Sequence, residues 1–194
     1  MQSKTLFLVE VAIFATIAFL LDKVASFYSV GWAYGGSISL SMVPVALIGL
    51  RWGLKGSFAA GILLGLLQMI TGASFIHYIQ IVVEYPVAFG VLGLSALFAP
   101  KVRRLLQEGK NSWIGYVILA AFLANTARFL IHFYAGIIYW GEYAPEGTPV
   151  VEYSLIYNLG YMVPTFMVST IAVILVVKAM PKFIVPMDRK TKVA

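Results

Sequence analysis

The sequence predicts an all-α integral membrane protein with six transmembrane helices, and three observations support this fold class. First, 61% of the residues are hydrophobic and only 11% are charged, whereas about a quarter of a soluble domain is charged. Second, the 194 residues suffice for about six spans of roughly 20 apolar residues each. Third, the basic residues gather in alternate links between the apolar segments. The mean hydropathy of +0.90 is consistent with an outer surface that faces lipid.

Breaks in the hydrophobic pattern define the six helices in order. The first apolar run follows Lys4 and is too long for the core of a cleavable signal peptide, so we expect no such peptide. The second run is short and follows YGGSISLS, which predicts that only part of this crossing is helical. No soluble linker interrupts the pattern, so residues 1–194 are expected to form a single membrane-embedded domain. The predicted spans are residues 5–27, 38–50, 54–71, 75–99, 112–140 and 151–179.

The basic residues predict the orientation of these helices. Of the fourteen Lys and Arg residues, only Lys23 and Arg128 do not fall on one side of a six-span arrangement. Because positive links remain inside, we expect that side and both termini to be cytoplasmic, in the cell membrane. The twelve residues are Lys4, Arg51, Lys55, Lys101, Arg103, Arg104, Lys110, Lys178, Lys182, Arg189, Lys190 and Lys192.

Several function classes lack their motifs. The chain has no cysteine, which excludes disulfides and thiolate metal sites. It has no Walker A loop, nucleophile elbow or clustered pair of carboxylates, so we expect neither an enzyme nor an ATPase. The net charge of +6 lies in the links between spans, which argues against a nucleic-acid partner. His77, Glu84 and His132 lack the spacing of a zinc motif, so no metal site is predicted.

Three ionisable residues within the apolar spans point to a functional site. Glu84, Arg128 and His132 would be costly in hydrocarbon, and such groups by default mark a pathway, a site or a counter-ion. Pro86 cannot donate a backbone hydrogen bond and frees the carbonyl of Val82, so we expect a kink beside Glu84 that makes room for a cavity. The alternative interpretation is a buried Glu84–Arg128 ion pair that only fixes helix register.

Polar and aromatic stripes accompany these residues on the last two spans. Steps of four along the fifth span join Arg128, His132, Gly136 and Trp140. The sixth span carries the stripes Tyr153–Tyr157–Tyr161 and Ser154–Asn158. Aromatic faces attract cations, and one buried carboxylate can neutralise a ligand's charge. The combination favours a mostly apolar pocket, open to the outer side, for a small planar cation.

Four stretches of the chain together resemble a known family. They are GGSISLSMVPVALIGLRWGLKG, VVEYPVAFGVLGLSALF, FLIHFYAGIIYWGEYAPEG and YSLIYN. In this order they are similar to the thiamin-specific substrate-binding subunit, or S-component, of energy-coupling factor (ECF) vitamin transporters, over roughly residues 10–180. The resemblance implies a six-helix protein that captures thiamin from outside, needs no cofactor, and docks on a transmembrane coupling subunit driven by two ATPase subunits.

The resemblance also implies residue roles. The binding residues it carries over are Glu84, Tyr85, His132, Gly136, Trp140, Tyr153, Ser154 and Asn158. It implies further aromatic contacts from two outer loops, for which Trp32 or Tyr34 and Phe75 or Tyr78 are the candidates. Small residues on the first helix would dock on the coupling subunit, namely Ala12, Ala15 and Thr16.

Two alternatives remain beside this interpretation. Related S-components share the fold and differ in ligand, so the vitamin could be another one or a pyrimidine precursor. A different class, a membrane-embedded enzyme or a self-sufficient carrier, would use the Glu84–Arg128 pair instead.

Overall fold

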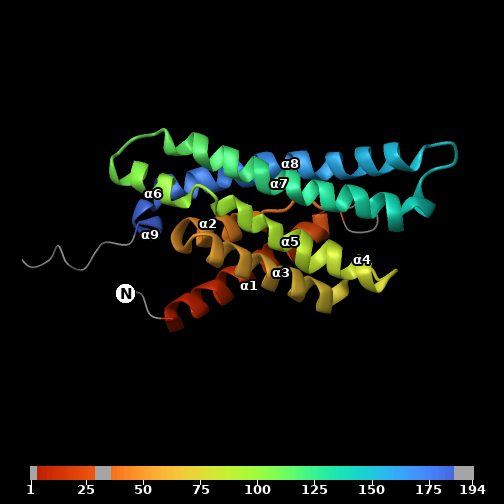
Figure 1. Ribbon diagram of the computed structural model, residues 1–194, viewed down its shortest axis with the longest axis horizontal. Coiled ribbons are helices and arrows are strands. Elements are labelled where there is room, and N and C mark those ends of the chain that lie inside the picture. Colours follow the sequence, from red (N-terminus) through yellow and green to blue (C-terminus); the bar gives the residue numbers. More distant parts are fainter. Residues whose placement is uncertain (1–3, 29–35, 186–194) are drawn as a thin grey trace, which may run out of the picture.

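Long helices run roughly along the long axis of the molecule (Figure 1). The computed structural model describes residues 4–28 and 36–185, and within those ranges every regular element is a helix. Five helical segments there are long and apolar enough to cross a membrane, and α2 (Met42–Trp52) is a shorter sixth. The all-α membrane fold predicted from the sequence is thereby confirmed. The five are α1 (Lys4–Tyr28), α3 (Leu54–Gly72), a composite segment (Tyr78–Gln107), α7 (Trp113–Tyr139) and α8 (Val150–Ala179).

The composite fourth segment departs from regular α-helix where the sequence predicts a kink. Glu84 and Pro86 both lie in a π-helical turn, η2. Such a turn widens the helix by one residue and is frequent at functional sites. The predicted disturbance is therefore present as the π-helical turn η2, and a 3₁₀ turn, η3, follows it. The segment continues to Gln107 rather than ending at residue 99 as predicted. The pieces are α4 (Tyr78–Val82), η2 (Val83–Val87), α5 (Ala88–Gly90), η3 (Val91–Ala96) and α6 (Ala99–Gln107).

The second crossing is only partly helical, as expected, but its helix starts later than predicted. Residues 38–41 are not helical, and α2 begins at Met42. At 1.5 Å per residue its eleven residues span about 16 Å, roughly half of a hydrocarbon core. The preceding residues 36–41 are not helical and lie along α8, and we call this segment the strap. The first, third, fifth and sixth predicted spans agree with the structure to within one residue at each end, whereas the fourth begins at Tyr78 rather than at residue 75. The short α9 (Pro181–Ile184) and η4 (Gly141–Tyr143) were not predicted.

Glycines on α3 bring it into backbone contact with the fourth segment. A Cβ on Gly65 would lie 2.6 Å from the Tyr85 carbonyl oxygen and 2.8 Å from the Pro86 Cα, and one on Gly61 would overlap the Phe89 carbonyl. Only residues without a side chain permit such close approach of two helices. The approach fixes the position of η2 and hence of Glu84.

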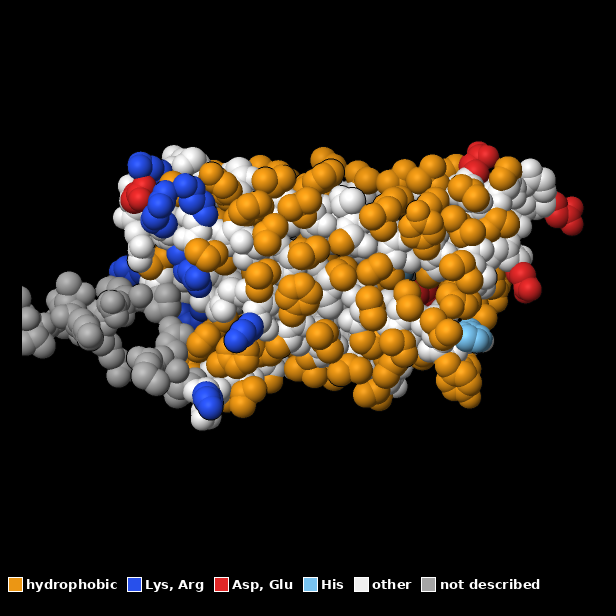
Figure 2. Space-filling model, in the orientation of Figure 1, with side chains coloured by type: hydrophobic (Ala, Val, Ile, Leu, Met, Phe, Trp, Pro, Cys, Tyr) orange, Lys and Arg blue, Asp and Glu red, His pale blue; other side chains and the backbone are white. Residues whose placement is uncertain are grey.

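One end of the bundle is closed by a charged clamp. The Glu10 carboxylate accepts hydrogen bonds from Arg51 Nε at 2.6 Å, Arg51 Nη2 at 2.8 Å and Trp52 Nε1 at 2.6 Å. Arg51 Nη1 also donates to the Phe183 carbonyl of α9, at 2.6 Å. Lys and Arg side chains cover this end, and acidic side chains dominate the end formed by α4 and the α7–α8 link (Figure 2).

The small residues of α1 divide between two faces. Ala15 is fully buried against α2 and α3, in a cluster with Ile48 and Ala60. Ala12 and Thr16 are exposed, and the Thr16 hydroxyl donates to the Ala12 carbonyl at 2.9 Å. Only these two of the three predicted docking residues can therefore contact a partner.

Candidate functional site

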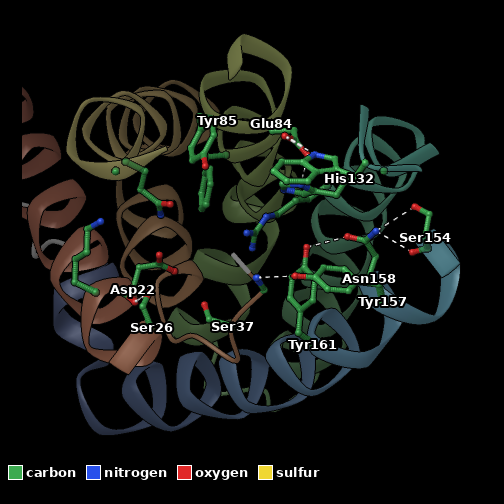
Figure 3. Close-up of a pocket in the computed structure, with 18 of the residues that line it drawn as sticks. Asp22, Ser26, Ser37, Glu84, Tyr85, His132, Ser154, Tyr157, Asn158 and Tyr161 are labelled. Atoms are coloured by element: carbon green, nitrogen blue, oxygen red, sulfur yellow. Dashed lines mark hydrogen bonds and ion pairs between the residues drawn. The ribbon is translucent and has the colours of Figure 1, made fainter. Parts of the chain in front are cut away.

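A cavity of about 160 Å³ lies between α1, α3, η2, α7 and α8 (Figure 3). One water molecule needs roughly 10–15 Å³ measured in the same way, so the cavity has room for a small organic molecule. All eight residues predicted as the core of the site line it: Glu84, Tyr85, His132, Gly136, Trp140, Tyr153, Ser154 and Asn158. Whether they bind a ligand stays a prediction.

Glu84 is a buried carboxylate surrounded by hydrogen-bond donors. Its side chain accepts hydrogen bonds from Trp140 Nε1, at 3.0 Å and 3.1 Å from the two oxygens, and from Gln80 Nε2. His132 Nδ1 lies 3.8 Å from Oε1. Hydrogen bonds of this kind stabilise an ionised carboxylate away from water. The pocket therefore contains a carboxylate whose position is fixed by the protein's own hydrogen bonds.

Gln80 is a member of this arrangement that the sequence analysis missed. It is fully buried one helical turn before Glu84. Its Oε1 accepts from the Ile76 amide at 3.2 Å, and its Nε2 also donates to the Ser74 carbonyl at 3.1 Å. Gln80 thus orients Glu84 from the loop side. The i−4 spacing from a buried carboxylate is the signal that could have identified it.

The alternative of a Glu84–Arg128 ion pair is wrong. The Arg128 guanidinium instead lies over the Phe89 ring, with its Cζ 4.4 Å from the ring centroid. Arg128 is 8% exposed, and its Nε has no hydrogen-bond partner in the described part of the chain. The same holds for His132 Nε2. Both side chains line the cavity, so it presents buried polar atoms that a ligand could satisfy.

The α8 wall of the cavity is a connected set of polar side chains. Ser154 Oγ donates to the Phe133 carbonyl of α7 at 2.8 Å. Asn158 Nδ2 donates to the Ser154 carbonyl at 2.9 Å, and the Tyr161 hydroxyl donates to Asn158 Oδ1 at 2.9 Å. Gly136 makes room for this set, because a Cβ there would overlap Ser154 Oγ. These hydrogen bonds hold the amide of Asn158 in one orientation.

The opposite wall was not predicted. Asp22 and Ser26 of α1 lie across the cavity from Glu84 and His132 (Figure 3). Gln68 of α3 joins this wall, and its Nε2 has no hydrogen-bond partner in the described residues. Asp22 was not among the residues predicted from the sequence. The cavity therefore carries a carboxylate at each side.

The predicted aromatic contacts from the outer loops are not found where the structure can be described. Phe75 and Tyr78 do not line the cavity, and they are 55% and 78% exposed. Their loop is held outside because His77 caps α4, accepting from the Ile79 amide, and stacks on the Tyr139 ring at 5.7 Å. Trp32 and Tyr34 lie outside the described residues.

Comparisons with known proteins agree with one another. Residues 8–185 match the model of the family described as Thiamine transporter protein (Thia_YuaJ). The chain is 38% identical over 186 residues to the thiamine transporter ThiT of Bacillus subtilis, covering 94% of this chain and 96% of that one. It is 31% identical over 189 residues to ThiT of Lacticaseibacillus paracasei, covering 95% and 92%. A solved structure of ThiT from Listeria monocytogenes superposes with a TM-score of 0.86 at 32% identity, covering 94% of this chain and 99% of that one.

Proposed function

Because the chain belongs to the thiamine transporter protein family, we propose that it is the thiamin-binding subunit of a vitamin uptake transporter. Membership makes it a multi-pass membrane protein of a transport family rather than an enzyme. Residues 1–194 would form one membrane-embedded binding domain.

The observation that carries the proposal is the buried Glu84 carboxylate beside the aromatic face of the cavity. Thiamin combines a cationic thiazolium ring with an aminopyrimidine, so it needs both an anion and flat apolar surfaces. Glu84 would balance the charge, and Trp140 and His132 would flank a ring. Tyr85, Tyr153, Ser154 and Asn158 would supply polar contacts, with Gly136 leaving the space between them.

The partners follow from the resemblance noted in the sequence. The chain would capture thiamin from the extracellular side of the cell membrane and dock on an ECF transmembrane coupling subunit driven by two ATPase subunits. The exposed Ala12 and Thr16 of α1 support a helix–helix contact, since small residues allow close approach in a bilayer. The basic end of the bundle would face the cytoplasm.

Thiamin binding can be tested on the detergent-purified chain by following tryptophan fluorescence. Trp140 lines the cavity, so thiamin should change the signal saturably. Riboflavin, biotin and a pyrimidine precursor serve as competitors, and displacement of thiamin by one of them would reassign the ligand within the same class. A folded protein without a saturable response would refute the proposal.

The alternative, a self-sufficient carrier, would use Glu84 and Arg128, which form no ion pair with each other in the described residues. Reconstitution in liposomes separates the two classes directly. The isolated chain should bind thiamin but not accumulate it, whereas net uptake without coupling subunits would favour the carrier.

A further inference from the structure

The strap, residues 36–41, forms part of the cavity wall although it is not helical. Gly36 and Ser37 line the cavity. Along the strap polar and apolar residues alternate, with Ser39 and Ser41 at most 2% exposed and Ile38 and Leu40 each 39% exposed. The strap thus turns its serines toward the bundle and its apolar side chains outward.

A non-helical backbone within a membrane protein must find hydrogen-bond partners from the protein itself. One residue of α8, Thr165, supplies two of them to the strap. Its Oγ1 accepts from the Ser39 amide at 3.3 Å and donates to the Ser37 carbonyl at 3.2 Å. Thr165 is 1% exposed, so its hydroxyl is shielded from bulk water.

Two further hydroxyls of α8 continue this pattern on either side of Thr165. The Tyr157 hydroxyl accepts from the Gly36 amide at 3.2 Å, on the cavity side. Ser169 Oγ donates to the Ser39 carbonyl at 3.1 Å, further into the bundle. The three residues are spaced by eight and by four, so they lie about two turns and one turn apart along α8. The strap is therefore held along its length by one helix.

Burial of a hydroxyl on α8 does not by itself create such a contact. Thr170 is 6% exposed on the same helix, and its Oγ1 has no hydrogen-bond partner within the described residues. Thr165 and Thr170 are both buried threonines of α8, but only Thr165 forms hydrogen bonds with the strap. Thr170 can therefore serve as the control for Thr165.

From this pattern we infer that Thr165 is a positioning residue for ligand binding, which acts by holding the strap in the place where Gly36 and Ser37 complete the cavity wall. The inference rests on the proposed thiamin-binding function. Apparent affinity falls in proportion to the fraction of molecules whose site is correctly formed. Loss of two buried hydrogen bonds should lower that fraction markedly, because both strap groups would be left without a partner.

The test compares Thr165→Val, Thr165→Ser and Thr170→Val with the unmodified chain in thiamin titrations. Valine keeps the shape and removes the hydroxyl, and we expect affinity to fall by about tenfold. Serine keeps the hydroxyl and should restore affinity to within about twofold of the unmodified chain. Thr170→Val should bind normally. Ser169→Ala removes one bond and should give an intermediate loss, which remains measurable if Thr165→Val does not fold.

Hydrogen exchange on the unliganded proteins distinguishes positioning from general destabilisation. In Thr165→Val the amides of residues 37–41 should exchange faster while those of α7 are unchanged. The inference would be overturned if Thr165→Val and Ser169→Ala both bound thiamin with unaltered affinity, or if exchange rose equally in all helices. Neither result would affect the proposed function. Failure of the unmodified chain to bind thiamin would overturn the proposed function and this inference with it.

Discussion

At the scale of single residues, Glu84 should lower the stability of the empty protein and raise its affinity for a cationic ligand. Glu84 is 8% exposed, and its carboxylate accepts hydrogen bonds from Trp140 and Gln80 rather than from a fully charged partner. A buried charge without a counter-charge lowers stability, and a cationic ligand would supply that counter-charge. Ligand binding and stability of the empty protein should therefore respond to this residue in opposite directions.

Replacing Glu84 by Gln tests that relation. The amide keeps the size and removes the charge, so we expect thiamin affinity to fall about 10–100-fold, the loss of a charged hydrogen bond. The thermal midpoint of the empty protein should stay the same or rise. Titration calorimetry and thermal unfolding in detergent measure the two effects. Glu152→Gln, an exposed acid at the start of α8, is the control and should change neither. Equal affinity of the two variants would contradict the role of Glu84.

Gly136 is the second residue with a directly testable role. A Cβ at this position would overlap Ser154 Oγ and lie 3.1 Å from its Cβ, so Gly136→Ala should displace Ser154 from the Phe133 carbonyl. We expect a destabilisation of about 1–3 kcal/mol, as for other overpacked sites, together with weaker thiamin binding.

The control for Gly136 lies on the same helix. Gly115 has open space where a Cβ would stand, so Gly115→Ala should be neutral or stabilising and should leave binding intact. Adding Ser154→Ala to Gly136→Ala should recover part of the lost stability, because it removes the overlapping oxygen. Equal unfolding midpoints for the two glycine variants would show that this contact is unimportant.

Which residues the sequence could identify depended on how conspicuous each was in an apolar run. Glu84 and His132 were conspicuous because ionisable groups are rare within spans. Asp22 was not, because a carboxylate near a helix end is ordinary. The partner of Arg128 could not be predicted either. Whether its guanidinium meets a carboxylate or the Phe89 ring depends on how two helices cross, which no local pattern encodes.

At the scale of helices, the disturbance in the fourth segment could be predicted from the sequence, whereas the start of the second helix could not. Pro86 lacks a donor, so a disturbed helix beside Glu84 followed from covalent structure alone. The start of α2 did not, because the alternating serines and apolar residues of the strap still average to an apolar run. The strap backbone forms hydrogen bonds with α8, more than a hundred residues away in the sequence. The hydrophobic periodicity of a segment carries no information about such distant partners.

The close approach of α3 to η2 gives a prediction at this scale. Gly65→Ala would place a Cβ 2.6 Å from the Tyr85 carbonyl oxygen, and a backbone cannot rotate away as a side chain can. We expect a destabilisation of about 1–3 kcal/mol and weaker thiamin binding, since Glu84 and Tyr85 move together with η2. Thermal unfolding and titration measure both effects.

Ile70→Ala on the same helix is the matched control for Gly65. Ile70 is 77% exposed on the outer surface, so its truncation should affect neither measurement. Normal binding in a clearly destabilised Gly65→Ala would mean that the position of η2 is not set by α3.

At the scale of the whole molecule, charge and cavity are distributed unequally between the two ends. The basic end is closed by the Glu10–Arg51 clamp and by a core cluster that includes Leu50, Trp113 and Val177. The cavity belongs to the other half, where acidic side chains dominate (Figure 2). Since basic links remain in the cytoplasm, the cavity should face the outside. Capture from outside therefore requires one particular orientation, which the absence of cysteine makes easy to test.

Single cysteines introduced at the two ends report that orientation in intact cells. Lys110 lies in the link between α6 and α7, and Glu146 lies in the link between α7 and α8, at the opposite end. With a membrane-impermeant maleimide, Glu146→Cys should be labelled in intact cells and Lys110→Cys only after permeabilisation. Both residues are exposed, so labelling of both in permeabilised cells is the internal control. The reverse pattern would turn the cavity toward the cytoplasm, and the chain could then not collect its ligand from outside.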